Sequence, residues 1–589
     1  MKTDQLSDRF LTWRNNHIND RQLIMFLSVV IGLAVGLAAV TIKNLVHLIE
    51  TNLSKLADVQ SGYWYIVFPT IGILLTILFI KYINRNPVRH GIPGVLFAIS
   101  KNWGKMKPHN LYSSIITSAL TVGFGGSVGL EGPTVATGAA IGSNIGRLFG
   151  LNYKQVTLLL GCACAGAMAA IFKAPIAAIV FALEVIMLDL TMSAIVPLLL
   201  SSVTAVITSY LFLGQNHLYA FTVNEPFSLD HIWIYAVFGI FTGLVAFYFT
   251  KVYLFISASF EKIENSFTRL IIGGSLLGIM IFFIPSLYGE GYEEINSSLR
   301  GDYNFLFEHT QYANLEGNIV VTIILFLVVL LMKVVATSLT FGSGGIGGIF
   351  APSLFSGAIA GLLFANVAQV SGYEISATNL AFVGMAGMIA AVIHAPLTSI
   401  FLIAELTKGY ELFVPLMIVS TISYATTKIF VTNSVYTIQL AKRGELLTHH
   451  KDKALLMLMN VKELIETDFN IIRPKQTLGD LINVIKFAHR NIFPVVEEDG
   501  TFRGMIKLDD IRHIMFYNEL YDDVLIRDLM FLPEFVIFTT DSMEEVAVKF
   551  QESGAYNIVV IDHGKYFGFI SRAKLFSAYR DLLKDFSEH

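Results

Sequence analysis

The sequence predicts an all-α polytopic membrane protein with an internal repeat, followed by a smaller α/β region. Three observations predict this fold class: long apolar runs, a repeated segment within them, and an uneven distribution of charge. Of the 589 residues, 54% are hydrophobic and 15% are charged, whereas a soluble protein carries about 25% charged residues. The last 139 residues hold 40 of the 86 charged ones, so an apolar body precedes a soluble tail.

The apolar runs are long enough to cross a membrane. A helix needs about 20 residues to span the bilayer core. The runs that approach or exceed this length are Leu23–Ile42, Trp64–Ile80, Thr191–Asn224, His231–Thr250, Leu270–Tyr288 and Asn318–Met332. The first run is too long for the apolar region of a signal peptide and lacks a clear cleavage site, so we expect it to remain in the mature protein.

Loop charges predict the orientation in the membrane. Residues 81–107 include six basic residues and no acidic one, whereas residues 289–317 include six acidic residues and one arginine. The positive-inside rule places the basic loop in the cytoplasm. The segment 1–22 is then cytoplasmic as well, and the acidic loop is expected outside.

The internal repeat is the main sign of organisation. Residues 166–184 (GAMAAIFKAPIAAIVFALE) align with residues 387–405 (GMIAAVIHAPLTSIFLIAE) at a constant offset of 221, with seven identities at small residues, proline, isoleucine and glutamate. Glycine-rich loops precede both copies: GGSVGLEGPTVATG begins at Gly125 and GSGGIGGIFAPSLFSG begins at Gly342. A duplication with interrupted apolar segments is typical of a transporter or channel whose site lies at the midplane.

The glycine-rich loops favour an anion as the transported species. Short helices that start after glycines present unpaired N–H groups and a partial positive charge. Close helix packing is the alternative explanation for these glycines. The net charge of −4 gives no case for nucleic acid. Cys162 and Cys164 flank one alanine in an apolar run, so we interpret them as small core residues without a disulfide or metal.

Other classes of membrane protein fit the sequence less well. An intramembrane hydrolase would need a catalytic set, and the chain has no HExxH motif, no nucleophile elbow and no plausible Cys/His pair. A metal transporter would need clustered acidic or histidine ligands in its spans, whereas the repeat loops offer N–H donors.

The loops also resemble those of the CLC family of chloride channels and chloride/proton antiporters. The similar segments are His90-Gly91-Ile92-Pro93, Gly129-Leu130-Glu131-Gly132-Pro133, Gly348-Ile349-Phe350-Ala351-Pro352, and Tyr436 in SVYTIQL. The chain is identified on these motifs as a prokaryotic-type member. The resemblance implies about eighteen helices, many tilted or broken, and two repeat halves (about 23–215 and 230–440) that are inverted in the membrane.

The resemblance also assigns roles in an anion site. The N–H groups of Ile349 and Phe350 and the Tyr436 hydroxyl are expected to hold a dehydrated anion, with His90 and Gly91 from the first loop. Such donors carry no fixed charge, so the ion binds and can still leave. No metal or catalytic residue is expected.

Glu131 matches the gating glutamate of the family. Its carboxylate is expected to occupy an anion position and to move out when it is protonated or displaced. The gate-loop backbone around it comprises Gly129, Leu130, Gly132 and Pro133. The alternative is a structural carboxylate that neighbouring N–H groups hold in place.

The chain departs from the family pattern at three positions. His90 stands where many members have serine, and either adds a pH-sensitive donor or only packs at a helix start. Leu130 replaces the basic residue before Glu131, which removes a positive charge and could weaken anion attraction or raise the pKa of Glu131. Val185 stands at the inner proton site of the antiporters and cannot carry a proton, so that site is lost here.

Val185 favours passive, channel-type conduction of chloride over chloride/proton exchange. Some relatives that lack the inner glutamate are nevertheless coupled, so exchange stays the alternative. Glu184 and Glu405 are equivalent in the repeat, and we interpret them as structural groups that cap or pair at the repeat interface.

The tail resembles a pair of cystathionine-beta-synthase (CBS) domains. The expected domains are 459–516 and 523–582, after a membrane domain 23–440 and a linker 441–458. We expect strands at Asn491–Val496, Thr501–Ile506, Tyr556–Ile561 and Tyr566–Ile570. A regulatory or dimerising role is predicted, and an adenine nucleotide is an alternative for which Asp510 and Ser571 are the candidate contacts.

The resemblance further implies partners and a location. The expected partners are chloride or a similar small anion, protons in the case of exchange, membrane lipids and a second copy of the chain. The expected location is the bacterial inner membrane, with both termini in the cytoplasm.

Overall fold

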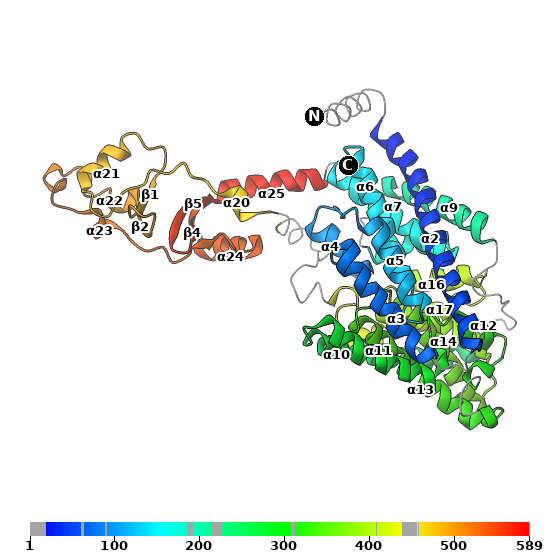
Figure 1. Cartoon of the computed structure of the whole chain (residues 1–589). Helices are drawn as coiled ribbons and strands as arrows, with labels where there is room; N and C mark the ends of the chain where they lie inside the picture. The colour runs from blue at the N-terminus through cyan, green and yellow to red at the C-terminus, as the bar shows by residue number, and fades with distance from the viewer. Residues whose placement is uncertain are drawn as a thin grey trace. The chain divides into compact units, whose positions relative to one another are not determined.

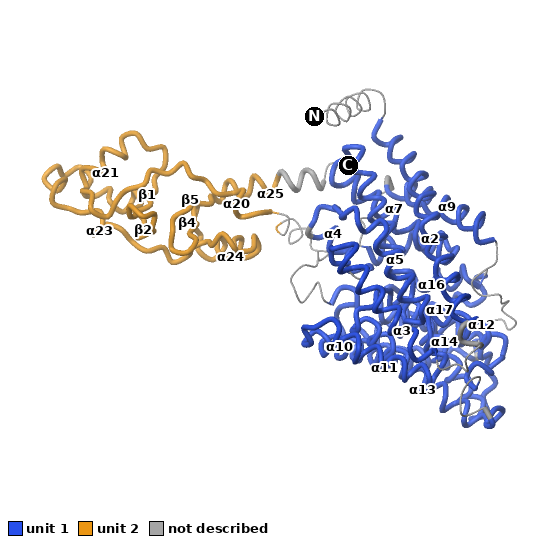
Figure 2. The backbone as a smooth tube through the Cα atoms, viewed as in Figure 1, with its two compact units in different colours: residues 1–446 blue, residues 447–589 orange. Residues whose placement is uncertain are grey.

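The structure is a computed structural model that describes residues 19–59, 64–88, 91–186, 192–214, 227, 229–307, 313–407, 409–438, 456 and 459–587. It divides into two compact units, residues 1–446 and residues 447–589, which Figure 2 shows in different colours. The expected N-terminal segment 1–22 and linker 441–458 lie almost wholly outside the described residues.

Unit 1 is a bundle of helices in two successive sets (Figure 1). The first set is α2 (Asp20–Val59), α3 (Trp64–Leu78), α4 (Gly91–Lys101), α5 (Asn110–Gly123), α6 (Glu131–Leu148), α7 (Tyr153–Phe172), α8 (Pro175–Glu184) and α9 (Met192–Leu213). The second is α10 (Ile232–Glu261), α11 (Ser266–Phe283), α12 (Tyr292–Leu299), α13 (Ile319–Gly342), α14 (Phe350–Val370), α15 (Ala377–Ile393), α16 (Pro396–Leu406) and α17 (Phe413–Phe430). Short segments are η1 (Phe79–Asn84), η2 (Leu229–His231), η3 (Pro285–Leu287), η4 (Asn304–Leu306) and η5 (Ala313–Leu315).

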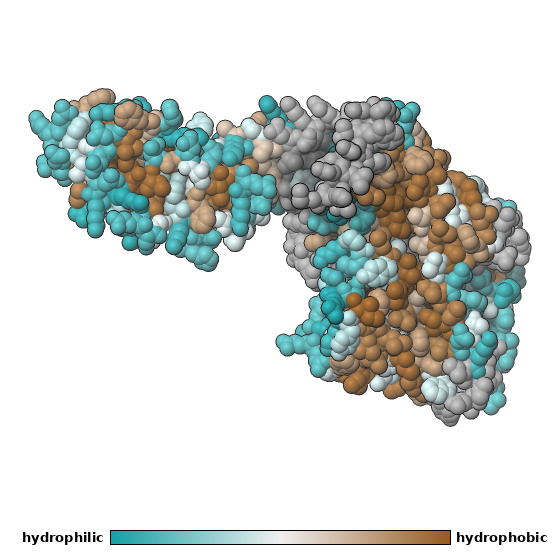
Figure 3. Space-filling model, turned by 45° about the horizontal axis from the view of Figure 1, so that its top comes forward, coloured by the Kyte–Doolittle hydropathy of each residue, from teal (hydrophilic) through white to brown (hydrophobic). Residues whose placement is uncertain are grey.

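Nine helices of the described part of the chain are long and apolar enough to cross a membrane. Each of the six predicted runs falls on one of them. The other three are α7, α14 and α17, in which small and hydroxyl-bearing residues interrupt the apolar ones. Hydrophobic residues cover much of the visible face of unit 1 (Figure 3). The chain is therefore a multi-pass integral membrane protein.

The backbone repeats along with the sequence. In the first set α6 packs on α7 and α7 on α9, and in the second set α14 packs on α15 and α15 on α17. Lys173 ends α7 with a left-handed φ of 56°, and His394, 221 residues later, ends α15 with a φ of 62°. Both turns lead directly into a helix that starts with proline. The predicted repeat is thus present in the structure.

Glycines let the paired helices approach closely. A Cβ atom at Gly142 of α6 would lie 2.4 Å from the Leu159 carbonyl oxygen of α7. A Cβ atom at Gly361 of α14 would lie 2.2 Å from the Leu380 carbonyl oxygen of α15. Because this backbone contact leaves no room for a side chain, the packing role considered for the repeat glycines applies to these two helix pairs.

The two repeats cap one another through a pair of glutamates. Glu184 ends α8, and its carboxylate accepts hydrogen bonds from the N–H groups of Leu397 (3.1 Å) and Thr398 (2.7 Å) at the start of α16. Glu405, near the end of α16, accepts from the N–H groups of Ile176 (3.1 Å) and Ala177 (2.8 Å) at the start of α8. The prediction that these glutamates cap at the repeat interface is confirmed.

This reciprocal capping fixes how the halves are related. The C-terminal end of each helix meets the N-terminal end of its equivalent, so α8 and α16 run antiparallel. Equivalent helices that run antiparallel require an approximate two-fold axis between the repeats. The halves are therefore inverted, as the family resemblance implies.

Unit 2 consists of two small α/β modules. The first holds α21 (Leu478–Ile485), β1 (Ile492–Val496), β2 (Phe502–Lys507), α22 (Leu508–Ile511), η6 (Asn518–Leu520) and α23 (Ile526–Leu529). The preceding α20 (Val461–Leu464) packs in the core of the second module. The second holds β3 (Ile537–Phe538), α24 (Met543–Ser553), β4 (Asn557–Asp562), β5 (Lys565–Ser571) and α25 (Arg572–Ser587). Strands β1 and β2 are antiparallel, as are β4 and β5, and β3 is parallel to β4. All four predicted strands are present within one or two residues.

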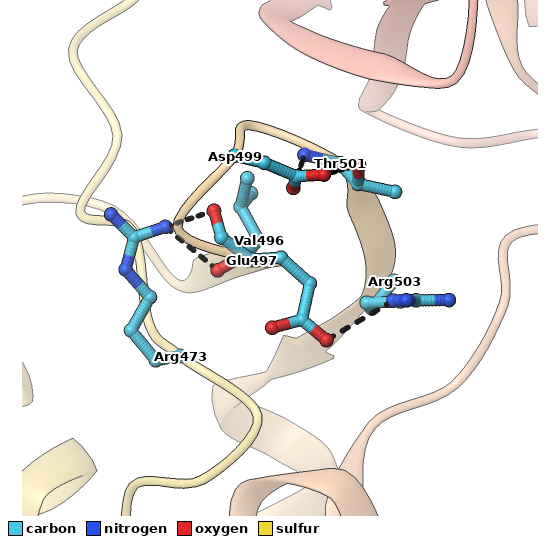
Figure 4. Close-up of polar contacts among 6 residues, drawn as sticks. All are labelled: Arg473, Val496, Glu497, Asp499, Thr501 and Arg503. Carbon is cyan, nitrogen blue, oxygen red and sulfur yellow. Dashed lines mark hydrogen bonds and ion pairs between the residues drawn. The ribbon is translucent and has the colours of Figure 1, made fainter.

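The hairpin of the first module shows how its turn is held (Figure 4). Asp499 accepts hydrogen bonds from the N–H group and the hydroxyl of Thr501, both at 2.9 Å. Arg473 donates to the carbonyl oxygen of Val496 at 2.8 Å, and Arg503 pairs with Glu497 at 3.2 Å. The two hydrogen bonds from Thr501 lower the pKa of Asp499. The turn at Asp499 and Gly500 therefore forms the hairpin connection between β1 and β2.

The helix contact at Gly142 generates a stability prediction. We expect Gly142→Ala to destabilise the protein by about 1–3 kcal/mol, because the new methyl group meets the Leu159 carbonyl oxygen. The matched control is Gly146→Ala on the same helix, where the nearest atom is a Val156 methyl carbon at 3.2 Å. Thermal unfolding of the purified protein in detergent measures both, and equal midpoints would contradict the packing argument.

The reciprocal caps generate a second prediction. Glu184→Ala and Glu405→Ala should each cost about 0.5–2 kcal/mol of stability, because each leaves N–H groups at a helix start without an acceptor. Glu184→Gln keeps one acceptor oxygen and should cost less. Glu261→Ala, at an exposed position at the end of α10, is the control. Thermal midpoints that are the same for Glu184→Ala and Glu261→Ala would show that the caps do not stabilise the fold.

Candidate functional site

The two glycine-rich loops meet at the centre of unit 1. The N–H group of Gly129 donates to the Gly348 carbonyl oxygen at 2.9 Å, and the N–H group of Gly348 donates to the Gly129 carbonyl oxygen at 2.7 Å. These residues are 219 apart, so the contact pairs equivalent positions of the two repeats. It places the starts of α6 and α14 side by side.

Each loop is also tied to the helix that precedes the other loop. The Thr340 hydroxyl oxygen of α13 accepts a hydrogen bond from the N–H group of Ser127 at 3.2 Å. The Thr121 hydroxyl oxygen of α5 accepts one from the N–H group of Ile346 at 3.1 Å. The four residues form two equivalent pairs at an offset of 219, so both loops are held by the same reciprocal contacts.

The start of α4 reaches the same place. Gly91 begins α4 with a φ of 32°, and a Cβ atom there would lie 2.8 Å from the Cα atom of Gly132. A Cβ atom at Gly132 would in turn lie 3.2 Å from the Cα atom of Gly348. The N-terminal ends of α4, α6 and α14 therefore converge, and only glycines allow their backbones to approach this closely.

The converging helix ends carry hydrogen-bond donors. Leu130 and Ile349 precede α6 and α14 with nearly the same backbone angles, and neither side chain caps its helix. The N–H groups of a first turn have no acceptor inside their own helix, and the helix end carries a partial positive charge. The site therefore favours a negatively charged occupant.

Glu131 supplies a negative charge at this place. It is the first residue of α6, its side chain is fully buried, and its Oε1 accepts a hydrogen bond from the Tyr292 hydroxyl of α12. Oε2 has no hydrogen-bond partner in the described part of the chain. A Cβ atom at Gly129 would lie 2.1 Å from this oxygen, so the glycine leaves the space that the carboxylate occupies.

A second carboxylate lies behind the gate loop. Glu290, in the loop before α12, accepts a hydrogen bond from the Leu130 N–H group at 3.0 Å. Burial and the neighbouring Glu131 raise the pKa of Glu290 to about 8, although the bond from Leu130 opposes this shift. The Leu130 side chain packs in an apolar cluster with Ile42 and Val122.

Two lysines add positive charge to the region. Lys333 of α13 is fully buried, donates to the Gly289 carbonyl oxygen at 3.2 Å, and lies 4.5 Å from the centre of the Phe355 ring. Lys43 of α2 donates to the Ile171 carbonyl oxygen at 2.9 Å and interacts electrostatically with Glu131 and Glu290. These cations partly balance the buried carboxylates, as buried charges require.

Tyr436 follows α17 and lies close enough to Glu131 to interact electrostatically with its carboxylate. Only 4% of its surface is exposed, and its hydroxyl has no hydrogen-bond partner within the described residues. A buried hydroxyl ordinarily finds a partner. The Tyr436 hydroxyl is thus available as a donor to a bound species.

The remaining site predictions have different outcomes. The structure brings Gly91, Gly129, Leu130, Gly132, Pro133, Ile349 and Phe350 into one region with Glu131. His90 lies outside the described residues, so its role stays a prediction. Val185 follows α8 and is 6% exposed, which places an aliphatic side chain where the family's inner proton site is expected.

The two candidate nucleotide contacts in unit 2, Asp510 and Ser571, differ in exposure and in hydrogen bonding. Asp510 is exposed on α22. The Ser571 hydroxyl donates to Glu466, whose carboxylate also pairs with Arg490 at 2.7 Å. Ser571 is therefore already engaged within the protein, and the nucleotide site stays a prediction.

Sequence reasoning missed Tyr292 and Glu290 as site residues. Both belong to the segment Gly289-Glu290-Gly291-Tyr292, which the sequence analysis interpreted only as part of an acidic loop. Gly291 has a φ of 89°, and a Cβ atom there would lie 2.3 Å from the Phe355 ring. Glycines that flank an acidic residue beside an apolar run were the available signal for a tight, buried turn.

Comparisons with known proteins agree with this geometry. The voltage gated chloride channel family matches residues 72–428, and the CBS domain family matches residues 461–517 and 526–581. A putative chloride channel protein ClcB-like from Ralstonia nicotianae is 29% identical over 436 residues, which cover 70% of this chain and 96% of that protein. An H(+)/Cl(-) exchange transporter ClcA from Vibrio cholerae is 28% identical over 417 residues, which cover 67% of this chain and 84% of that protein.

A solved structure supports the fold. The crystal structure of a slow cyanobacterial Cl-/H+ antiporter has a TM-score of 0.62 and 21% identity, and the match covers 72% of this chain and 98% of that one. The family match spans more than half of the chain and includes the gate loops. The chain therefore belongs to the voltage-gated chloride channel family, the CLC family, and carries a pair of CBS domains after its membrane unit.

Proposed function

We propose that this protein exchanges chloride for protons across a membrane, with Glu131 as the gate. The observation that carries the proposal is the buried Glu131 carboxylate, which lies where helix N-terminal ends converge and which has one oxygen without a hydrogen-bond partner among the described residues. As a member of its family, the protein is a chloride transporter and not an enzyme.

The chemistry of the site suits a small anion. The N–H groups at the start of α14 and the Tyr436 hydroxyl donate hydrogen bonds without fixed charge, so they bind an anion and allow it to leave. The paired glycines hold these donors in place before the anion arrives. Chloride is the proposed ion because the similar proteins are named for chloride.

The same site gives the carboxylate two states. When it is ionised, Glu131 competes with an anion for the positive ends of the helices. When Glu131 is protonated, it is attracted much less to the positive helix ends, and the anion can occupy the position instead. Binding of a proton to Glu131 therefore lets the anion enter its position, and this link between the two events is the basis of coupled transport.

Passive conduction is the second candidate. Val185 favours conduction, because its buried aliphatic side chain cannot carry a proton from the cytoplasm. Exchange has the stronger support, because similar proteins such as the one from Vibrio cholerae are named as H(+)/Cl(-) exchange transporters. In either case the Glu131 gate and the anion donors have the same roles.

The CBS pair is proposed as a regulatory or dimerising module of a homodimer. The engagement of Ser571 by Glu466 argues for a structural use of that position in the second module. In the first module, Asp510 is exposed and is therefore accessible to a nucleotide.

Replacement of the gate glutamate tests the proposal. In liposomes with opposing chloride and pH gradients, the wild type should show a reversal potential that depends on both gradients. Glu131→Gln cannot bind or release the proton, so its reversal potential should follow chloride alone. The same measurement distinguishes the two candidates, because a wild-type potential that ignores pH would support conduction.

A matched control separates a loss of gating from a general defect. Glu411→Gln changes an exposed glutamate before α17 and should retain the wild-type behaviour. A Glu131→Gln protein whose flux and pH dependence equal those of the wild type would overturn the proposed gate.

Removal of the Tyr436 hydroxyl tests the anion site. A hydrogen bond to a charged group contributes about 1.5–3 kcal/mol, so Tyr436→Phe should weaken chloride binding by about tenfold or more. Isothermal titration calorimetry of the purified protein measures this affinity. Tyr410→Phe, at a position that is 63% exposed, is the control, and equal affinities in both variants would exclude Tyr436 from the site.

A further inference from the structure

We propose that Glu290 is a second protonatable group of the gate, which shares a proton with Glu131 and sets the pH at which the gate opens. This inference rests on the proposed function of Glu131. It assigns a positioning role to a residue outside the three loops that the family resemblance identifies.

Glu290 contacts the gate loop directly. Its Oε1 accepts a hydrogen bond from the Leu130 N–H group at 3.0 Å, directly before the residue that carries the gating carboxylate. No acceptor for the N–H group of Ile349, the equivalent residue of the second repeat, is found among the described residues. Glu290 therefore accepts the hydrogen bond of a gate-loop N–H group that would otherwise have no acceptor.

One turn of the chain contacts both carboxylates. Tyr292, two residues after Glu290, donates its hydroxyl hydrogen to Glu131. Gly291 between them has a φ of 89° and packs against the Phe355 ring, so the turn has little freedom. A change in the charge of Glu290 therefore acts on Glu131 both through space and through this short segment.

Charged groups of both signs surround Glu290. Lys43 and Glu50 face it from α2, Glu131 from the start of α6, and Lys333 from α13. The two lysines favour the ionised form and the two glutamates favour the neutral form. Burial tips this balance and raises the pKa of Glu290 to about 8.

When two neighbouring carboxylates are both ionised, their negative charges repel each other, so the pair binds one proton more readily than an isolated carboxylate does. The ionised form of one raises the proton affinity of the other. In this protein the ionised Glu290 makes Glu131 easier to protonate, so the gate begins to open at a higher pH than Glu131 alone would allow. A second proton then neutralises both groups and releases the Glu131 carboxylate fully.

Glu290 is also reachable for protons. Glu290 and Tyr292 are half-buried and the next residue, Glu293, is exposed, whereas Glu131 is fully buried. The segment thus connects the surface of the acidic loop with the buried gate.

The test measures chloride efflux from liposomes as a function of pH for the full-length protein. Glu290→Gln keeps an acceptor for the Leu130 N–H group but carries no charge, so the pH at which transport begins should fall by about one unit. Glu290→Asp restores a carboxylate and should return the profile toward that of the wild type. Glu293→Gln, on the exposed neighbour, should leave the profile unchanged.

Two outcomes overturn the inference. If Glu290→Gln retains the wild-type pH profile while Glu131→Gln loses its pH dependence, the gate stands and the role of Glu290 is wrong. If Glu290→Gln and Glu290→Asp shift the profile equally, the residue acts only through structure. Failure of the proposed function is separate, because then Glu131→Gln itself retains the wild-type pH dependence. Gel filtration and the thermal midpoint of each variant show that it is folded.

Discussion

The membrane unit depends on one small contact, the pair of hydrogen bonds between the backbones of Gly129 and Gly348. Both residues are glycines, and the neighbouring Gly132 and Gly91 pack against the same point. The contact holds helix ends of like partial charge side by side, which is electrostatically unfavourable unless a negative charge lies between them. The fold thus creates the need for an anion or a carboxylate at this place.

The two-fold relation between the halves does not extend to the gate. The hydroxyls of Thr121 and Thr340 hold the opposite loops in the same manner. The symmetry ends one residue after the paired glycines, where Glu290 binds the Leu130 N–H group and Glu131 occupies a position that Phe350 takes in the second repeat. One half therefore carries the carboxylates, and the other keeps donors for the anion.

The repeat and the caps were predictable from the sequence because they depend on local patterns at fixed offsets, whereas the inversion of the halves was implied only by the family resemblance. Gly166 and Gly387, or Glu184 and Glu405, are recognisable from spacing and from family resemblance. The sequence did not predict Tyr292 and Glu290 as site residues, because their contacts with the gate loop span about 160 positions of the chain. No periodicity or motif encodes such a contact, so the turn that brings them to Glu131 became visible only in the structure.

The hydrogen bonds of the glutamates also separate structural from mobile carboxylates. Glu184 accepts three bonds from residues of α16, and Glu405 accepts two from the start of α8. Glu131 accepts a side-chain bond from Tyr292 at one oxygen, while its other oxygen has no partner in the described residues. Because each hydrogen bond to a charged group contributes about 1.5–3 kcal/mol, the caps hold their carboxylates more firmly than the gate does. Glu184 and Glu405 therefore serve as structural caps, whereas Glu131 keeps one oxygen without a hydrogen-bond partner among the described residues, as a carboxylate that changes places with an anion requires.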